Sequence, residues 1–250
     1  MGVRLECARP VAYDSLDHLH PFGAVLNNST NARFNALLYA LFPGRRIRVL
    51  DLGCAGGGFV EECVRDGHLA VGLEGSDVSL KAKRDAWGRI PQNLFTCDVT
   101  EPFVLRDETT SEPLLFDAVT AWELVEHIPE EKLPRLFENV VHHLAPEGIF
   151  IASTTFYPSV HDGHDLHVTR RRKAWWIRTL RAAGLAYRRD YLLYFAGQFV
   201  RGGLELPGRY HLVCTDRREH PPSPTWNGLR GAVRYHAGRC VNSLRGIPNL

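Results

Sequence analysis

Residues 47–59 read IRVLDLGCAGGGF and carry the clearest signal of fold class in the chain. Branched apolar residues run up to Asp51 and give way at once to glycines, which predicts a buried strand, a tight turn and then a helix. Gly53, Ala55 and Gly57 leave that turn almost without side chains. A turn of this kind serves either close packing or the close approach of a ligand to the backbone. The rest of the sequence must separate these two interpretations.

Outward from this turn, short apolar runs alternate with longer helical patterns. Regular alternation of strands and helices predicts an α/β fold with a mostly parallel, seven-stranded sheet and helices on both faces. Sheets of this type bind ligands at the carboxyl ends of their strands. The predicted strands are 47–52, 68–74, 93–98, 114–123, 149–155, 187–195 and 210–215, and the predicted helices are 57–67, 76–87, 133–144 and 171–185.

The acid before the first glycine distinguishes two kinds of nucleotide site. A dinucleotide site uses G-x-G-x-x-G and places a pyrophosphate on the helix N-terminus. Asp51 would repel a pyrophosphate but suits a ligand with an ammonium group, so an NAD-linked oxidoreductase is disfavoured. The spacing D-x-G-x-A-x-G resembles motif I of the class I S-adenosylmethionine (AdoMet)-dependent methyltransferases, with Ala55 in place of the middle glycine. This resemblance implies a Rossmann-like methyltransferase fold and AdoMet as cofactor.

Two further acids stand at the ends of the next two predicted strands. Glu74 ends AVGLE, where the family holds the ribose hydroxyls, and Asp98 ends FTCD, where the family contacts the adenine amino group. The resemblance is specific over residues 46–155 and looser over 156–215. The cofactor-binding residues that it implies are Asp51, Gly53, Cys54, Ala55, Gly57, Glu74, Gly75, Asp98, Val99 and Trp122.

The fourth predicted strand ends in AWELVEHIP, residues 121–129. The resemblance implies that the segment after this strand borders the transferring methyl group. Glu123, Glu126 and His127 have the spacing that brings side chains together on one helical turn. The pattern E-x-x-E-H resembles the metal-binding element of ubiquinone-biosynthesis O-methyltransferases and of small-RNA 2′-O-methyltransferases. Both groups carry a further histidine after the fifth strand, a place that His164 or His167 fills here.

Two chemistries remain open at this acceptor site. Carboxylate and imidazole ligands suit a divalent cation such as Mg²⁺, Mn²⁺ or Zn²⁺, held by Glu123, Glu126, His127 and His164 or His167. Without a metal, His127 or His167 is the candidate general base, because an imidazole titrates near neutral pH. The predicted catalytic residues are Glu123, His127 and His167.

Three regions are expected along the chain. Residues 1–45 contain NARFNALLYALFPG, an amphipathic helix expected to cover the cofactor crevice. Residues 46–215 form the methyltransferase domain, and residues 216–250 form an extension rich in Pro, Gly and Arg. Six scattered cysteines predict a reducing, cytoplasmic setting, and the lack of a long apolar run predicts no membrane insertion. A net charge of +2 neither requires nor excludes a nucleic-acid partner.

The preferred hypothesis is O-methylation of a hydroxyl on a small molecule or glycan, because the chain shows no added recognition domain and little net charge. An alternative is an RNA ribose 2′-O-methyltransferase, suggested by E-x-x-E-H and the arginine-rich extension. A third is a non-catalytic AdoMet sensor or partner subunit, which the candidate acceptor-site residues disfavour. The sequence does not predict the oligomeric state.

Overall fold

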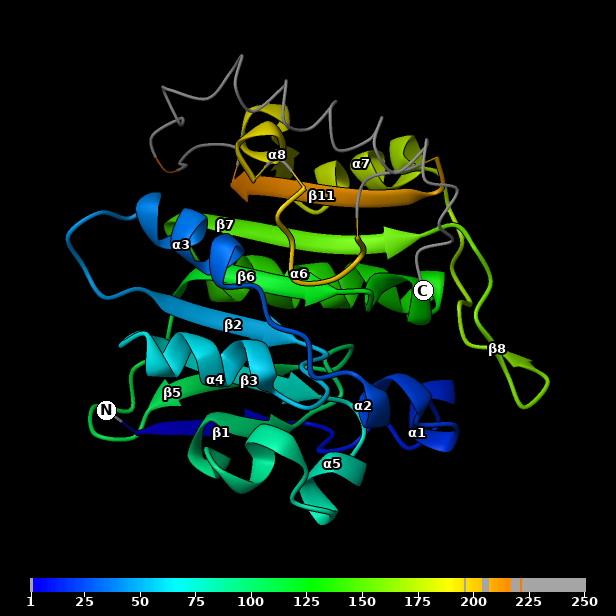
Figure 1. Cartoon of the computed structure of the whole chain (residues 1–250), viewed down its shortest axis with the longest axis horizontal. Helices are drawn as coiled ribbons and strands as arrows, with labels where there is room; N and C mark the ends of the chain where they lie inside the picture. The colour runs from blue at the N-terminus through cyan, green and yellow to red at the C-terminus, as the bar shows by residue number, and fades with distance from the viewer. Residues whose placement is uncertain (1, 196, 204–206, 217–220, 222–250) are drawn as a thin grey trace.

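A computed structural model of the chain describes residues 2–195, 197–203, 207–216 and 221, so the predicted extension 216–250 lies almost entirely outside the described residues. Its centre is the predicted seven-stranded sheet (Figure 1), in the order β10-β11-β7-β6-β2-β3-β4. The strands are β2 (Arg48–Leu52), β3 (Leu69–Glu74), β4 (Leu94–Thr96), β6 (Phe116–Trp122), β7 (Leu144–Thr155), β10 (Leu185–Tyr187) and β11 (Arg209–Asp216).

The helices surround this sheet, and two small antiparallel pairs lie beside it. The small pairs are β1 (Val3–Cys7) with β5 (Phe103–Asp107), and β8 (Val160–His161) with β9 (His164–Asp165). The helices are α1 (Leu16–Leu19), α2 (Phe22–Leu26), α3 (Ala32–Ala40), α4 (Gly58–Arg65), α5 (Val78–Lys81), α6 (Leu133–His143), α7 (Lys173–Ala182) and α8 (Arg189–Phe195). The short 3-10 helices are η1 (Asp85–Gly88), η2 (Pro91–Asn93), η3 (Val125–His127) and η4 (Glu130–Lys132).

The direction of the strands creates a ligand crevice at β2. Strands β4, β3, β2, β6 and β7 are parallel to one another, whereas β11 pairs antiparallel to β7. Strand β2 comes first of these in the chain and lies between β3 and β6, so the connections leave it in both directions. Open sheets bind ligands at such a switch point, beyond the carboxyl ends of the strands.

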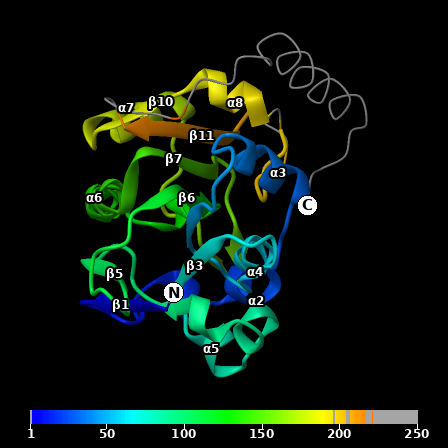
Figure 2. The same cartoon turned by 90° about the vertical axis from the view of Figure 1, so that its left-hand side faces the viewer.

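Each face of the sheet is covered by its own set of helices (Figure 2), which pack on it through an apolar layer. Helices α3, α4 and α8 pack on one face, where Phe34, Phe59 and Phe195 are almost fully buried. Helices α6 and α7 pack on the other face through residues such as Phe137 and Trp176, together with the β1–β5 pair. Because successive side chains of a strand point to opposite faces, β2 contributes to both layers.

Two predicted elements differ in the structure. The predicted strand 187–195 is wrong: β10 ends at Tyr187 and α8 follows, because Tyr191, Leu192 and Phe195 have helical spacing and are buried together. The predicted helix 76–87 is split into α5 and η1. Lys83 and Asp85, with φ of 50° and 47°, interrupt it.

The N-terminal region covers the crevice with a different segment from the one predicted. The predicted helix forms as α3, but its Phe34 ring packs edge-on against Trp122 on one face of the sheet, with centroids 5.1 Å apart. Residues 12–27, which include α1 and α2, lie over the crevice instead. The backbone amide of Ala12 donates to the carbonyl of Gly75 at 2.9 Å and holds this segment beyond the end of β3.

Candidate cofactor and acceptor site

A cavity of about 650 Å³ lies at the carboxyl ends of the strands, which is ample for a small ligand. Its wall joins two groups of residues that the sequence predicts for different tasks. The predicted cofactor residues in the wall are Gly53, Ala55, Glu74, Gly75, Asp98 and Val99, and the predicted acceptor-site residues are Glu123, His127 and His167.

The glycine turn serves packing and the cavity at once. Gly53 has φ of +70° and Ala55 has φ of 49°, and both line the cavity. Gly56 faces the N-terminal segment: a Cβ there would lie 2.7 Å from Asn28 Oδ1, and its amide donates to the Asn27 carbonyl at 2.9 Å. The turn thus packs against the N-terminal segment at Gly56 and lines the cavity at Gly53 and Ala55.

Asp51 is buried beneath this turn and does not line the cavity itself. Thr120 Oγ1 donates to Asp51 Oδ1 at 2.6 Å, whereas Oδ2 is buried without a hydrogen-bond partner among the described residues. Burial raises the pKa of Asp51 to about 7, although the charge of Arg201 and the Thr120 hydrogen bond oppose this rise. A nearby ammonium group would satisfy Oδ2 and favour the ionised form.

Glu74 is fixed by the backbone on both sides. Its Oε2 accepts from the amide of Ala55 at 2.7 Å, and its Oε1 accepts from the amide of Ser76 at 3.1 Å. Burial raises the pKa of Glu74, and these two amides counteract the rise by stabilising the carboxylate. The side chain is therefore held in one orientation at the cavity wall and can still accept hydrogen bonds from ligand hydroxyls.

Asp98 is held by Thr100, two residues further along the chain. Its Oδ1 accepts from the amide of Thr100 at 3.0 Å and from Thr100 Oγ1 at 2.6 Å. Its Oδ2 lies 3.4 Å from an Nη atom of Arg9, a neighbour that the sequence did not predict because it comes from the N-terminal segment. Oδ2 has no well-aligned hydrogen bond among the described residues.

Like Asp51, three further predicted cofactor residues lie behind the cavity wall rather than in it. Cys54 is buried against Gly72, where a Cβ would lie 2.8 Å from the Cys54 sulfur. Gly57 precedes α4 with φ of +79°, and a Cβ there would meet Leu94 at 2.7 Å. Trp122 is fully buried among the aromatic rings of the α3–α4–α8 layer. Their side chains shape the turn and its support without reaching the cavity.

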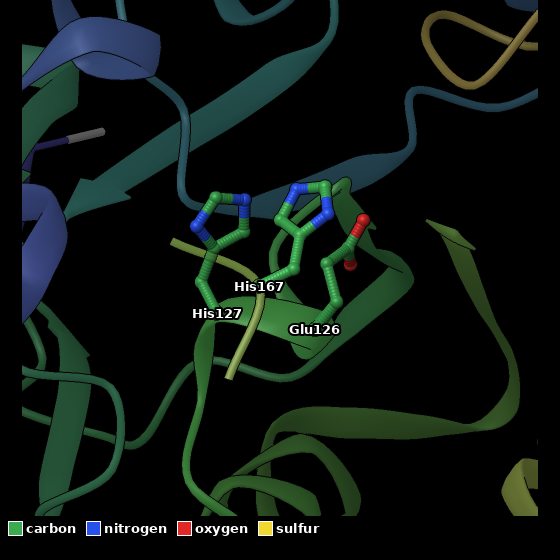
Figure 3. Close-up of side chains that lie close together, drawn as sticks. All are labelled: Glu126, His127 and His167. Atoms are coloured by element: carbon green, nitrogen blue, oxygen red, sulfur yellow. The ribbon is translucent and has the colours of Figure 1, made fainter. Parts of the chain in front are cut away.

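The predicted acceptor-site residues separate into a close group and two outlying residues. Glu126, His127 and His167 project to the same side (Figure 3), and one possible ligand atom from each lies within 4.8 Å of the others. Glu123 lines the cavity but stays outside this group; its φ is 49°, and its amide donates to Ser153 Oγ at 2.9 Å. His164 also stays outside and stacks on His20, with ring centroids 4.3 Å apart.

His127 is a cation at neutral pH in this arrangement. Burial alone would lower the pKa of His127, but the carboxylates of Asp17, Glu126 and Glu123 raise it to about 9. Asp17 Oδ1 lies 3.0 Å from His127 Nδ1, in an ion-pair contact whose angle is poor for a hydrogen bond. The sequence did not predict Asp17, because it is supplied by α1 from a distant part of the chain.

His167 has the opposite character. Its Nδ1 donates to the carbonyl of Tyr157 at 2.6 Å, which leaves Nε2 as the unprotonated nitrogen of a neutral imidazole. Burial lowers the pKa of His167, and the neighbouring His127 cation, 4.7 Å away between ring centroids, lowers it further. His167 is thus neutral where His127 is charged.

Glu126 completes the group from η3. The amide of Thr155 donates to Glu126 Oε1 at 3.2 Å, and Oε2 is buried without a partner among the described residues. Burial raises the pKa of Glu126 to about 7, although the His127 cation opposes this rise. One carboxylate and two imidazoles form a donor set suited to Mn²⁺ or Zn²⁺. The orphaned oxygen is compatible with such an ion, whereas the proton on His127 competes with it.

Comparison with known proteins identifies the family to which the chain belongs. A family model described as a methyltransferase domain matches residues 28–192. Ubiquinone biosynthesis O-methyltransferase of Neisseria meningitidis is 33% identical over 111 residues, which cover 43% of each chain. The enzyme of the same name from Bartonella tribocorum is 26% identical over 145 residues, which cover 54% of each. The chain thus spans about half the length of the curated relatives it matches.

Solved structures show the same fold at low sequence identity. A TehB-like SAM-dependent methyltransferase from Corynebacterium glutamicum superposes with a TM-score of 0.54 at 15% identity, covering 80% of this chain and 94% of that one. The PH0226 protein from Pyrococcus horikoshii gives a TM-score of 0.53 at 16% identity, covering 83% and 95%. Among the described residues, none of the helices has the length and apolar character that a membrane span requires.

The family match takes in the glycine turn, Glu74, Asp98 and the E-x-x-E-H segment, and so includes both ends of the cavity. The predicted sheet is present, and structures of SAM-dependent methyltransferases share its fold. We conclude that the chain belongs to the class I AdoMet-dependent methyltransferases.

Proposed function

We propose that the protein transfers the methyl group of AdoMet to a hydroxyl oxygen of a small-molecule or glycan acceptor. The observation that carries this proposal is the position of His167. Its side chain lines the same cavity as Gly53 and Glu74, and its Nδ1 donates to the Tyr157 carbonyl. A neutral imidazole at the far end of a cofactor cavity is suited to accept the proton of a hydroxyl group. The name of the curated relatives, O-methyltransferase, supports oxygen as the accepting atom.

At the cofactor end, the strand-end acids are assigned to the groups of AdoMet that they suit chemically. Glu74 accepts hydrogen bonds from the two ribose hydroxyls, and Asp98 accepts one from the adenine amino group. Asp51, buried beneath the glycine turn with Oδ2 unpartnered, is assigned as the counter-charge of the methionine ammonium from behind the cavity wall. Three carboxylates near a ligand with a sulfonium and an ammonium favour that ligand over a dinucleotide.

At the acceptor end, the two histidines have different tasks. His167 Nε2 takes the hydroxyl proton while the oxygen attacks the methyl carbon opposite the departing sulfur. The new O–CH₃ bond forms as the S–CH₃ bond breaks, and S-adenosylhomocysteine leaves. His127, kept cationic by Asp17, stabilises the negative charge that develops on the acceptor oxygen. Alignment of the acceptor within the cavity supplies the rest of the rate.

Glu126, His127 and His167 would hold a divalent cation if one is used. Such an ion would act as a Lewis acid on the acceptor hydroxyl and lower its pKa. Glu126 Oε2 supports this second chemistry because it is buried without a partner, whereas the contact between Asp17 and His127 supports the metal-free route. Glu123 is assigned to lining the acceptor position, and His164 to the loop surface.

A screen of hydroxyl-bearing acceptors with methyl-labelled AdoMet tests the proposal. Label should appear on an acceptor oxygen, and the His167→Asn variant should lose the activity. Label on nitrogen or carbon, or full activity of the variant, would refute the proposal. Dialysis against a chelator then separates the two chemistries. If activity is lost and then restored by Mg²⁺, Mn²⁺ or Zn²⁺, a metal ion activates the hydroxyl. If activity is unchanged, His167 alone accepts the hydroxyl proton.

The other two hypotheses make different predictions in the same screen. An RNA 2′-O-methyltransferase would label a terminal ribose, and deleting residues 216–250 would abolish RNA binding. A sensor would bind AdoMet without transferring label to any acceptor. The position of His167 in the cavity favours catalysis over the sensor, and a cavity of about 650 Å³ that must also hold the cofactor favours a compact acceptor.

A further inference from the structure

Arg201 belongs to the cavity wall but has no part in the chemistry proposed above. It lies in the segment between α8 and β11, and its side chain lines the cavity. Its Nε is buried without a hydrogen-bond partner, and within the described part of the chain Arg201 forms no ion pair with a carboxylate. A guanidinium is charged at any working pH, and a buried donor without an acceptor is unfavourable. An anionic group of a ligand would satisfy this donor and its charge.

The backbone around Arg201 is firmly placed. The Arg201 carbonyl accepts from His211 Nε2 at 3.1 Å, and the Phe199 carbonyl accepts from Asn31 Nδ2 at 3.0 Å. The Phe199 ring stacks on His211 with centroids 3.8 Å apart. Gly202 follows with φ of +90°, and a Cβ there would lie 2.7 Å from that of Ser153. The guanidinium is thus presented to the cavity from an anchored turn.

The electrostatic neighbours of Arg201 show which end of the cavity it serves. Its charge opposes the rise that burial causes in the pKa of Asp51, Cys54 and Glu74. The main charges acting on His127 come instead from Asp17, Glu126 and Glu123, and those acting on His167 come from His127, Asp165 and Asp17. Arg201 therefore faces the cofactor end, close to the buried Asp51, rather than the acceptor end.

We infer that the Arg201 guanidinium binds the α-carboxylate of the methionine part of AdoMet, opposite the ammonium group that is assigned to Asp51. AdoMet carries one carboxylate, and a guanidinium fork matches it with two parallel hydrogen bonds. The inference rests on AdoMet as cofactor but not on the identity of the acceptor. An arginine that enters from the segment before β11 thus completes a site whose acids come from β2, β3 and β4.

Calorimetry with two product analogues tests the inference without any acceptor. The probes are S-adenosylhomocysteine and its decarboxylated form, which keeps the nucleoside, the thioether and the amine. Wild-type protein should bind the decarboxylated form roughly 30-fold more weakly, the size expected for a charged hydrogen-bonded pair. Arg201→Gln should weaken S-adenosylhomocysteine by a similar factor and bring the two affinities within about threefold of each other.

Arg209→Gln is the matched control, because Arg209 is a second arginine in the cavity wall. It should keep the wild-type difference between the two probes. An Arg201→Gln variant that weakens both probes equally would make Arg201 a counter-charge for the acids and overturn the inference. Unchanged S-adenosylhomocysteine affinity would overturn it too and assign Arg201 to an anionic acceptor. If Arg201→Gln fails to fold, Arg201→Lys serves instead and should reduce the difference between the probes.

Discussion

The two ends of the cavity are built in different ways. At the cofactor end, Gly53, Glu74 and Asp98 follow three neighbouring parallel strands, β2, β3 and β4. At the acceptor end, Asp17 and His167 are brought together with η3 from segments more than a hundred residues apart in the chain. The first end is a consequence of sheet topology, whereas the second depends on loops that pack over it.

This difference extends to the electrostatics. The cofactor acids are fixed by neighbouring groups: Glu74 by two backbone amides, and Asp98 by the amide and hydroxyl of Thr100. The acceptor group takes its charge state from other side chains, so that His127 is cationic while His167 is neutral. Substitutions at one end should therefore affect binding of AdoMet, and substitutions at the other should affect transfer.

The largest expected effect is at the acceptor end. His167→Asn keeps a donor for the Tyr157 carbonyl but removes the base, so methyl transfer should fall by roughly 100- to 10,000-fold. Affinity for AdoMet, measured by calorimetry, should stay within about twofold, because His167 is assigned no contact with the cofactor. His142→Asn, an exposed histidine on α6, is the control and should remain active. Loss of AdoMet binding in His167→Asn would contradict the assignment of AdoMet binding to one end of the cavity and methyl transfer to the other.

The next effect is at the cofactor end. Glu74→Gln replaces a carboxylate that holds both ribose hydroxyls with an amide that accepts less well, so AdoMet should bind about 100-fold more weakly. Glu138→Gln, on the exposed surface of α6, should bind AdoMet normally in the same titration. Wild-type affinity of Glu74→Gln would exclude Glu74 from the cofactor site.

The charge state of His127 makes stability depend on pH. Its folded pKa of about 9 lies above the ordinary value of 6.5, so the stabilisation is complete below pH 6.5 and is lost as the pH rises through 9. In metal-free buffer, the free energy of unfolding measured with urea should fall by about 2 kcal/mol between pH 7.5 and 9.5. This range lies above the pKa of Glu126, about 7, so that Glu126 contributes little to the change. Asp17→Asn should flatten this dependence. An equal slope in both proteins would show that Asp17 does not hold the proton on His127.

The smallest effect concerns the residue that departs from the family's glycine pattern. Ala55 has φ of 49°, a conformation that costs a residue with a side chain about 1 kcal/mol and costs glycine little. Ala55→Gly should therefore raise the melting temperature by about 2 °C and leave AdoMet affinity almost unchanged. Ala55→Val should lower the melting temperature, because a branched side chain is disfavoured at positive φ. A fall for Ala55→Gly would contradict this account of the turn.

Much of the fold could be predicted because it is recorded in local pattern. The runs before Asp51 and around Glu74 become β2 and β3 within about one residue of their predicted ends. The segment 187–195 could not be assigned from its mixture of aromatic and basic residues, since Tyr191 and Phe195 show a helical face only when their burial is known. The β1–β5 pair was missed because its partners are far apart in the sequence.

The same distinction applies to the site. The carboxyl ends of parallel strands lie at one edge of the sheet, so the sequence was enough to predict that the strand-end acids lie together. Asp17 and Arg201 had no motif to mark them, and their positions depend on how α1 and the turn before β11 pack. The choice between His164 and His167 was likewise open, because β8 and β9 decide which of the two turns toward His127.

A structure of the protein with S-adenosylhomocysteine tests the central claim most directly, namely that one cavity holds the cofactor at the glycine turn and the acceptor at His167. The account predicts the ribose hydroxyls on Glu74, the adenine beside Asp98 and the sulfur directed toward His167. A nucleoside bound outside this cavity, or bound in it with its sulfur turned away from the two histidines, would contradict the account.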